Sequence, residues 1–413
     1  MKKPELLMPA GSLDVLKTAF TYGADAVYLG GDLYGLRAKA ENFDGERMRE
    51  GIAFAHERGG KVYVTVNITA HDRDFEGLEK YLSELKEIRP DALIVSDPGV
   101  FDTARRICPE IDIHISTQAN NTNSRTFLFW AKQGAKRVVS ARELSLEEIG
   151  TIRKSIPEDF EIETFVHGAM CISYSGRCLL SNYMTGRDAN LGECTHPCRW
   201  KYYVTEETRP GEYMPVFENE RGTFIFNSKD LCMVRHIPEL LKAGIDSFKV
   251  EGRMKTALYV ATVARAYRLA IDDFLEDPAK YEARKDFYFE EIGKCTNRNF
   301  STGFFFGKPG ADSQNYGTST YIKDYVYLGT VNLVDKEGYA HLEQKNKFSV
   351  GDCLECMRPD GENTQLRVLD MTDEEGAHME SCPHPKQHIR VKFDVMPAEG
   401  NVLRIYSQKK EGL

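Results

Sequence analysis

A cysteine-rich stretch over residues 163–198 holds the side chains best suited to chemistry. It reads E-T-F-V-H-G-A-M-C-I-S-Y-S-G-R-C-L-L-S-N-Y-M-T-G-R-D-A-N-L-G-E-C-T-H-P-C and contains Cys171, Cys178, Cys194 and Cys198, and a fifth cysteine follows at Cys232. Thiolates are soft ligands for zinc, copper and iron-sulfur clusters. Because glycine, asparagine and arginine accompany them, we expect a thiolate-bound metal or cluster beside an anionic ligand, and we interpret this stretch as the active site.

The spacing of these cysteines bears on the kind of metal site. Six residues separate Cys171 from Cys178, fifteen lie before Cys194, three before Cys198 and thirty-three before Cys232. Zinc fingers and ribbons usually show two closely spaced pairs, and this stretch has one. Iron-sulfur clusters accept wider, irregular spacing. The spacing favours a cluster over zinc or plain buried cysteines, and it leaves the fourth ligand open.

Length and charge limit the class of protein. The chain has 413 residues, which suits one large barrel plus a smaller module. It begins M-K-K-P-E-L-L-M-P-A-G and has no run of about 18 apolar residues, so we expect a cytoplasmic protein with no membrane partner. In that compartment ten cysteines are expected as thiols rather than disulfides. The net charge of -9 argues against a large nonspecific nucleic-acid footprint but permits a local basic patch.

The first 300 residues alternate short β-branched runs with amphipathic segments. Strands are predicted at Leu6–Met8, Ala26–Leu29, Val62–Val66, Ala92–Val95, Ile113–Ser116, Arg137–Ser140, Ile162–Val166 and Ser247–Val250. Helices are predicted at Leu13–Tyr22, Glu46–Glu57, Phe75–Ile88, Val100–Arg106, Ser124–Gln133, Leu146–Lys154, Met233–Ala243 and Thr256–Phe274. Eight such units predict an α/β fold, a closed (β/α)8 TIM-like barrel over residues 1–300 with a cysteine-rich insertion at about 168–232. An open doubly wound sheet is the alternative.

The pattern changes after about residue 300. Alternating apolar runs are separated by turns such as D-K-E-G and R-P-D-G, and they lie at Tyr325–Val331, Tyr339–Leu342, Cys353–Met357, Gln365–Leu369, Ile389–Phe393 and Val402–Tyr406. These runs predict a small C-terminal antiparallel β-barrel over residues 315–413. We expect it to serve substrate docking or packing, since its residues form no catalytic pattern.

In a (β/α)8 barrel the residues after the strands share one rim, where such enzymes keep their chemistry. Here those positions hold Asn67, Asp97, Gln118, Asn120, Arg142, Glu143, His167, Cys171, Glu251 and Arg253. Each alone is readily explained as a cap or turn residue. Their alignment on one rim predicts a polar site.

The cysteine-rich stretch also resembles a known family. Residues 163–181, E-T-F-V-H-G-A-M-C-I-S-Y-S-G-R-C-L-L-S, match the signature of peptidase family U32, the collagenase-like peptidases, along their whole length. The segments N-S-K-D-L-C-M and D-S-F-K-V-E-G-R-M-K look like further segments of that family. The resemblance covers essentially the full chain.

This resemblance implies a hydroxylase, although the family name says peptidase. Better understood members are oxygen-independent hydroxylases with a 4Fe-4S cluster. The branch of this length modifies the tRNA anticodon stem-loop, forming 5-hydroxyuridine at uridine 34 with prephenate as co-substrate, and relatives act on 23S rRNA or quinone precursors. The chain has neither H-E-x-x-H nor G-x-S-x-G. We therefore expect a tRNA hydroxylase, with a peptidase or another hydroxylase as the alternative. Some relatives work as pairs, so a paralogous, basic partner subunit would suit so acidic a chain.

Roles for individual residues follow from this expectation. The predicted cluster ligands are Cys171, Cys178, Cys194 and Cys232, with Cys198 competing for the fourth place. Arginine forks match carboxylates and phosphates, so the predicted anion binders are Arg142, Arg177, Arg187 and Arg253, each equally explained by a structural ion pair.

Other side chains are candidates for handling the substrate. His167, Glu163 and Asn120 are predicted to position or deprotonate it, and burial against an arginine is the alternative for Glu163. Tyr174 and Tyr183 are predicted to stack an unpaired base, or else to shield the cluster from solvent.

Overall fold

The computed structural model describes residues 2–31, 34–35, 43–171, 173–187, 189, 192–200, 203–204, 214–215, 228–310, 313 and 321–407. The chain divides into two compact units. The first comprises Met1–Leu16, Asp25–Met254 and Arg298–Tyr321, and the second comprises Lys17–Ala24, Lys255–Asn297 and Ile322–Leu413. Across the described ranges, every helix is too short or too polar to span a bilayer.

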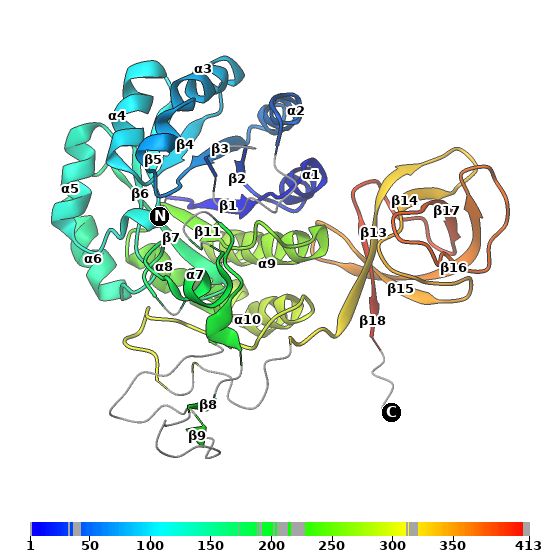
Figure 1. Cartoon of the computed structure of the whole chain (residues 1–413). Coiled ribbons are helices and arrows are strands. Elements are labelled where there is room, and N and C mark those ends of the chain that lie inside the picture. Colours follow the sequence, from blue (N-terminus) through cyan, green and yellow to red (C-terminus); the bar gives the residue numbers. More distant parts are fainter. Residues whose placement is uncertain are drawn as a thin grey trace. The chain divides into compact units, whose positions relative to one another are not determined.

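Eight parallel strands close into a barrel in the first unit (Figure 1). In order they are β1 (Glu5–Pro9), β2 (Ala26–Gly30), β3 (Lys61–Val66), β4 (Ala92–Val95), β5 (Asp112–Ile115), β6 (Arg137–Val139), β7 (Glu161–Gly168) and β11 (Ser247–Val250). Ser247 is in register with Glu163 of β7 on one side and with Glu5 of β1 on the other, which closes the ring. The predicted TIM-like barrel is confirmed, and the open sheet is wrong.

The barrel strands are nearly continuous apolar runs because both of their faces are covered, as is usual in parallel sheets. All residues of β2 and β4 are buried. Side chains of four neighbouring strands form one buried cluster, which consists of Leu7, Ala26, Tyr28, Tyr63, Ala92 and Ile94. This packing fixes the register of the strands and therefore the positions of the residues that follow them.

Helices follow most of the strands. They are α1 (Leu13–Thr21), α2 (Gly45–His56), α3 (Leu78–Ile88), α4 (Pro98–Ile107), α5 (Ser124–Gln133), α6 (Leu146–Ser155) and α8 (Ile237–Lys242). The third helix starts at Leu78 rather than Phe75, because Gly77 adopts a φ of 112° that a helix cannot include. The predicted helix at Met233 is split into a 3-10 turn, η5 (Val234–His236), followed by α8.

The insertion after β7 leaves the barrel and returns to it. It contains α7 (Leu180–Thr185) and a two-stranded sheet of β8 (Tyr203–Val204) and β9 (Met214–Pro215). The chain returns in β10 (Asp230–Cys232), which runs antiparallel to the end of β7, and β12 (Phe300–Ser301) then pairs with β10. The start and the end of the insertion therefore meet at one strand.

The second unit contains a helix pair and a small closed barrel. The helices are α9 (Ala257–Glu276) and α10 (Pro278–Gly293). The barrel strands, in chain order, are β13 (Tyr325–Val334), β14 (Ala340–Glu343), β15 (Cys353–Met357), β16 (Asn363–Asp373), β17 (His388–Phe393) and β18 (Val402–Tyr406). All of their pairings are antiparallel, and β13 pairs with β18 to close the ring. The predicted antiparallel β-barrel is confirmed.

Buried charges join the parts of the second unit. Glu291 of α10 accepts hydrogen bonds from Arg265 of α9 and, at 3.0 Å, from Arg404 of β18. It also pairs with Lys294. All but Lys294 are at most 4% exposed. Because a buried charge is costly without a partner, this cluster ties the helix pair to the small barrel.

Candidate active site at the ends of the barrel strands

A polar pocket lies at the carboxyl ends of the barrel strands. It holds about 550 Å³ of space between atoms, including the solvent at its opening. Its described lining comprises Tyr28, Thr65, Asn67, Ile94, Ser116, Thr117, Gln118, Val139, Arg142, Phe165, Lys249, Glu251 and Arg253. Three of these side chains are cationic and one is anionic, so the pocket favours an anionic ligand.

Two of the cations share one aromatic ring. The Arg142 guanidinium carbon lies 4.4 Å from the centroid of the Phe165 ring, and the Lys249 ammonium lies 5.6 Å from it. The ammonium also lies 4.4 Å from the Tyr28 ring. Arg142 in addition donates to the carbonyl of Ala169 at 2.9 Å. These contacts hold two positive charges beside the same wall of the pocket.

The third cation, Arg253, is 5% exposed and depends on a glycine. Its guanidinium donates to Thr65 Oγ1 at 3.0 Å and lies against Gly30. A Cβ atom at position 30 would approach Arg253 Nη1 to 2.5 Å. The missing side chain of Gly30 therefore provides the space in which the guanidinium lies.

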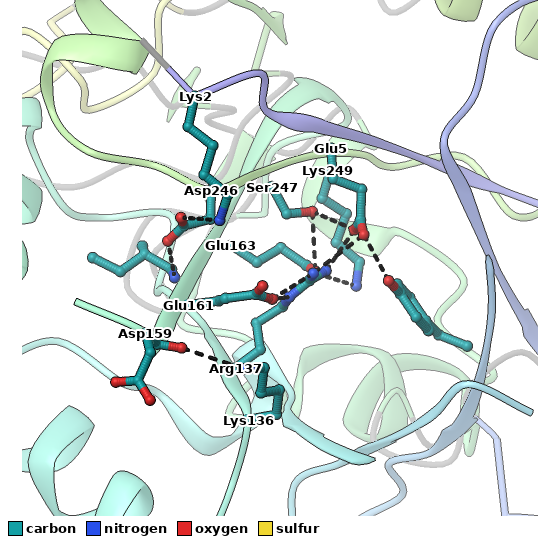
Figure 2. A network of polar contacts seen from close by, with 12 residues as sticks. Lys2, Glu5, Lys136, Arg137, Asp159, Glu161, Glu163, Asp246, Ser247 and Lys249 are labelled. Atoms are coloured by element: carbon teal, nitrogen blue, oxygen red, sulfur yellow. Dashed lines mark hydrogen bonds and ion pairs between the residues drawn. The ribbon is translucent and has the colours of Figure 1, made fainter. Parts of the chain in front are cut away.

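A charge network with a buried centre continues from the pocket toward the amino ends of the strands (Figure 2). Arg137, at the start of β6, contacts Glu5 at 2.6 Å, Glu161 at 2.7 Å and Glu163 at 2.8 Å. The other oxygen of Glu163 accepts from Lys249 Nζ at 2.7 Å. Glu163 therefore bridges Arg137 below and the lysine that lines the pocket above.

Burial and ion pairing set the charges in this network. Burial alone would raise the pKa of Glu5, but the Arg137 guanidinium lowers it below its ordinary value of 4.5. Burial alone would lower the pKa of Arg137, but Glu5 and Glu163 raise it well above its ordinary value. Burial, with the charges of Arg137 and Lys249, holds the pKa of His114 well below 6.5. The network thus consists of charged carboxylates and cations beside a neutral imidazole.

The structure brings together half of the predicted rim residues. Asn67, Gln118, Arg142, Glu251 and Arg253 all line the pocket. Two other predicted residues, Asp97 and Glu143, are not part of the pocket lining. Asp97 caps α4 by accepting from the amides of Gly99 and Val100.

The first part of the cysteine-rich insertion packs against the pocket. Asn120, in the left-handed conformation at φ 55°, donates to the carbonyls of Gln118 at 2.8 Å and Ser175 at 3.2 Å. A Cβ atom at Gly176 would approach Gln118 Oε1 to 2.3 Å. Asn120 and Gln118 therefore position the loop that carries Cys171 and Cys178.

The remaining predicted substrate residues are exposed on that insertion. Tyr174 is 46% exposed and Tyr183 is 85% exposed. Arg177 and Arg187 are exposed as well. None of these four is among the described residues that line the pocket.

The predicted metal ligands lie at the start, within and at the end of the insertion. The ten cysteines, all of them among the described residues, form no disulfides. Cys171 follows β7 and is exposed, whereas Cys232 is buried in β10, opposite His167. Cys178, Cys194 and Cys198 are half-buried, and Cys194 Sγ accepts from the amide of His196 at 3.4 Å. Thiols in this number suit a thiolate-bound cluster, although the described residues contain no assembled group of three or more His, Cys, Asp or Glu side chains.

His167 and Glu163 are both buried in β7. His167 is 2% exposed, and its ring lies 5.8 Å from that of Phe300. Glu163 is fully buried, and both of its oxygens contact cations. That position favours the structural interpretation of Glu163, burial against an arginine.

Reasoning from sequence missed Lys249 as a pocket residue. It lies inside a strand predicted from its apolar neighbours, and it is 4% exposed. A lysine within a buried strand is unusual unless it is paired, and this was the available signal. Thr65 and Tyr28 gave no such signal, because threonine and tyrosine are common in strands.

Comparison with known proteins identifies the family. Residues 11–315 match the family model described as Peptidase family U32, and residues 323–404 match the one described as Peptidase family U32 C-terminal domain. The chain belongs to peptidase family U32. The resemblance found in the cysteine-rich stretch is thereby confirmed.

Relatives in family U32 include proteins named for RNA modification. The chain is 42% identical to the tRNA hydroxylation protein P1 of Bacillus subtilis (strain 168), over 98% of this chain and 95% of that protein. It is 41% identical to the tRNA hydroxylation protein P of Escherichia coli (strain K12), over 93% and 92%. It is 34% identical to the 23S rRNA 5-hydroxycytidine C2501 synthase of Escherichia coli (strain K12), over 73% of this chain and 45% of that protein.

Proposed function

We propose that this protein is a tRNA hydroxylase with its active site in the pocket at the carboxyl ends of the barrel strands. The observation that carries the proposal is the similarity, along 98% of the chain, to a protein named as a tRNA hydroxylation protein. The cationic lining supports it, since both RNA phosphates and small acids are anionic. Hydroxylation of uridine 34 to 5-hydroxyuridine, without molecular oxygen and with prephenate as co-substrate, is the specific reaction that we propose.

The pocket offers groups that suit a single extruded base. Asn67 and Gln118 present side-chain amides, which can donate to and accept from a uracil edge. Tyr174 and Tyr183, exposed on the insertion, present aromatic faces on which unpaired bases stack. We therefore assign the amides to base recognition and the two tyrosines to RNA contact outside the pocket.

A 4Fe-4S cluster is the cofactor that we propose. Its ligands would be Cys171, Cys178, Cys194 and either Cys198 or Cys232. When bound, such a cluster supplies one-electron chemistry that protein side chains lack. The packing of Gly176 against Gln118 supports this assignment, because it brings the loop between the first two cysteines to the edge of the pocket.

The chain's own residues would bind and orient the reactants. Arg142 and Arg253 are assigned to anion binding, because both line the pocket. His167 is assigned to proton transfer, for which an imidazole is suited. Asn120 is assigned to positioning the loop, since it joins Gln118 to Ser175. Glu163 is assigned to positioning Lys249, because its oxygens are occupied by cations.

Nucleoside analysis of tRNA tests the proposal. The gene is expressed in a strain that lacks 5-hydroxyuridine in its tRNA, beside the R142Q and R253Q variants, and tRNA, 23S rRNA and quinones are analysed by mass spectrometry. We expect 5-hydroxyuridine to return with the wild-type protein and to fall about tenfold or more with either variant. Modified cytidine in rRNA, or a hydroxylated quinone with unchanged tRNA, would overturn the substrate assignment. Peptide cleavage with no modified product would establish the peptidase alternative.

A further inference from the structure

We propose that Lys249 is a deep anion-binding residue of the pocket, and that it holds the inner acidic group of the small dicarboxylate that the proposed function already implies. One acidic group would contact Lys249, and the other would contact Arg142 and Arg253 nearer to the opening. The proposal rests on the proposed function in that the same pocket serves the reaction. It adds the depth at which the ligand binds and the residue that holds it there.

The position of Lys249 supports the deeper of the two contacts. Lys249 lies within β11, whereas Arg142 and Arg253 follow the ends of β6 and β11. In a parallel barrel, residues within a strand lie deeper than residues beyond its carboxyl end. The lysine is 4% exposed yet lines the pocket, so the little surface that it retains faces the ligand space.

The contacts of Lys249 hold its charge in one place. Its Nζ lies 2.7 Å from Glu163 Oε1 and faces the Tyr28 and Phe165 rings at 4.4 and 5.6 Å. Glu163 is in turn held by Arg137 at 2.8 Å. Figure 2 shows this contact as a dashed line. A lysine side chain normally loses much rotational freedom on binding an anion. Here that freedom is already restricted, so less is lost when the ligand binds.

The charge balance explains why Lys249 can serve two partners. The network contains three carboxylates, of which Glu163 is buried and Glu5 and Glu161 are half-buried, against the two buried cations Arg137 and Lys249. An ammonium group has three N–H donors, and Glu163 is the one hydrogen-bond acceptor recorded for it among the described residues. The other N–H groups are available to a ligand carboxylate in the pocket.

The pocket geometry favours a small acid over an RNA phosphate at this depth. Phosphates of RNA lie on the outside of the chain, and the rim arginines meet such a backbone before Lys249 does. The wall formed by Phe165 and Tyr28 suits the apolar body of a small molecule between two acidic groups. We therefore commit to a small dicarboxylate, and RNA contact is an outcome of the test.

The test uses a variant that preserves the charge of the network. Replacing Lys249 alone would leave three carboxylates against Arg137 and could prevent folding. The E163Q/K249Q double variant removes one charge of each sign, so the formal charge of the network is unchanged. E163Q alone keeps the lysine, and K242Q makes the same lysine change on the exposed surface of α8 as a matched control.

Binding is measured by calorimetry on the full chain with prephenate, glutarate and butyrate, and thermal unfolding verifies that each variant is folded. We expect the wild-type protein and K242Q to prefer glutarate over butyrate. E163Q/K249Q should lose about tenfold or more in affinity for both dicarboxylates and little for butyrate. E163Q should show a smaller loss, because the ammonium remains but is held less firmly.

Two results would overturn the proposal. One is an unchanged dicarboxylate affinity in a folded E163Q/K249Q variant. The other is a loss confined to an anticodon stem-loop RNA, which would place a phosphate on Lys249. Binding is measured without turnover, so the two proposals can fail separately. If the protein binds dicarboxylates through Lys249 but does not modify tRNA, only the proposed function is refuted. Absence of dicarboxylate binding to a wild-type protein that modifies tRNA would refute this proposal and prephenate as co-substrate, but not tRNA hydroxylation.

Discussion

Cys232 lies directly opposite His167, where β10 runs antiparallel to the end of β7. Cys171 follows the same strand after a few residues. Two cysteines far apart in the chain are thus brought to one end of one barrel strand. This arrangement favours Cys232 over a purely sequence-local set of ligands, and it makes the fourth ligand a question that experiment can answer.

Replacing any of Cys171, Cys178 or Cys194 with serine should lower the iron content sharply, because each change would remove one thiolate ligand of the proposed 4Fe-4S cluster. The measurement is iron and acid-labile sulfide in anaerobically purified protein, with about four irons per chain expected in the wild type. C198S and C232S are measured separately, and one of them should lose the iron. C108S is the control, since burial raises the pKa of Cys108 to about 11 and keeps it a thiol. Iron-free wild-type protein would contradict the cluster.

Replacing Gly30 with alanine should displace Arg253, because the new Cβ would lie 2.5 Å from Nη1. We expect tRNA modification to fall about tenfold with a cost of about 1–3 kcal/mol in stability, as for overpacked sites. The measurements are 5-hydroxyuridine content and thermal unfolding. G150A is the matched control, since no described atom beyond the surrounding backbone of its own helix lies within 4 Å of that Cβ, and it should leave modification unchanged. Full modification by G30A would show that Arg253 has no role in binding.

His114 should make stability depend on pH below about 6.5. Burial, with Arg137 and Lys249, lowers the pKa of His114 in the folded state, so below 6.5 the unfolded chain takes up a proton that the folded chain does not. The free energy of unfolding should therefore fall by up to about 1.4 kcal/mol per pH unit as the pH decreases, and level off above 6.5.

Denaturant unfolding of the wild type and of H114N between pH 5 and 7.5 tests this. In the variant, the free energy of unfolding should depend less steeply on pH, by an amount that corresponds to about one proton. The carboxyl of Glu5, whose pKa is lowered below 4.5, contributes stability that is lost only as the pH falls below that value, outside this window. Equal slopes in the two proteins would mean that folding does not lower the pKa of His114.

Replacing Glu291 with glutamine should destabilise the second unit by about 3–5 kcal/mol, because buried Arg265 and Arg404 would lose their shared carboxylate. The change should be visible in thermal unfolding of the full chain and in faster amide exchange in α9 and β18. E282Q on the same helix removes a surface pair with Lys285 and should change stability by less than about 1 kcal/mol. Similar effects from the two variants would show that the buried cluster adds little.

The barrel strands could be predicted closely because their signal is local. The runs Ala92–Val95 and Ser247–Val250 have the same bounds in the sequence prediction and in the structure. The positions after the strands followed from the fold class, and this is why Asn67, Gln118 and Arg253 were found.

Other features depend on contacts between distant segments, which one sequence does not reveal. The periodicity of the third helix includes Phe75, but the conformation of Gly77 ends the pattern there. The pairing of Cys232 with His167 needs the return path of the insertion. The role of Lys249 needs the knowledge that Glu163, in a different strand, lies beside it.

The pairing of Leu231 with Gly168 means that the insertion leaves and rejoins the barrel at the end of one strand, β7. A long loop whose two ends are already close together can vary in length at little cost in stability. The cysteine-bearing segment is thus a module that is joined to the barrel at one strand end. Transferring this module to another barrel in which the two ends of the insertion lie at the same positions would be a route to changing the reaction while keeping the barrel.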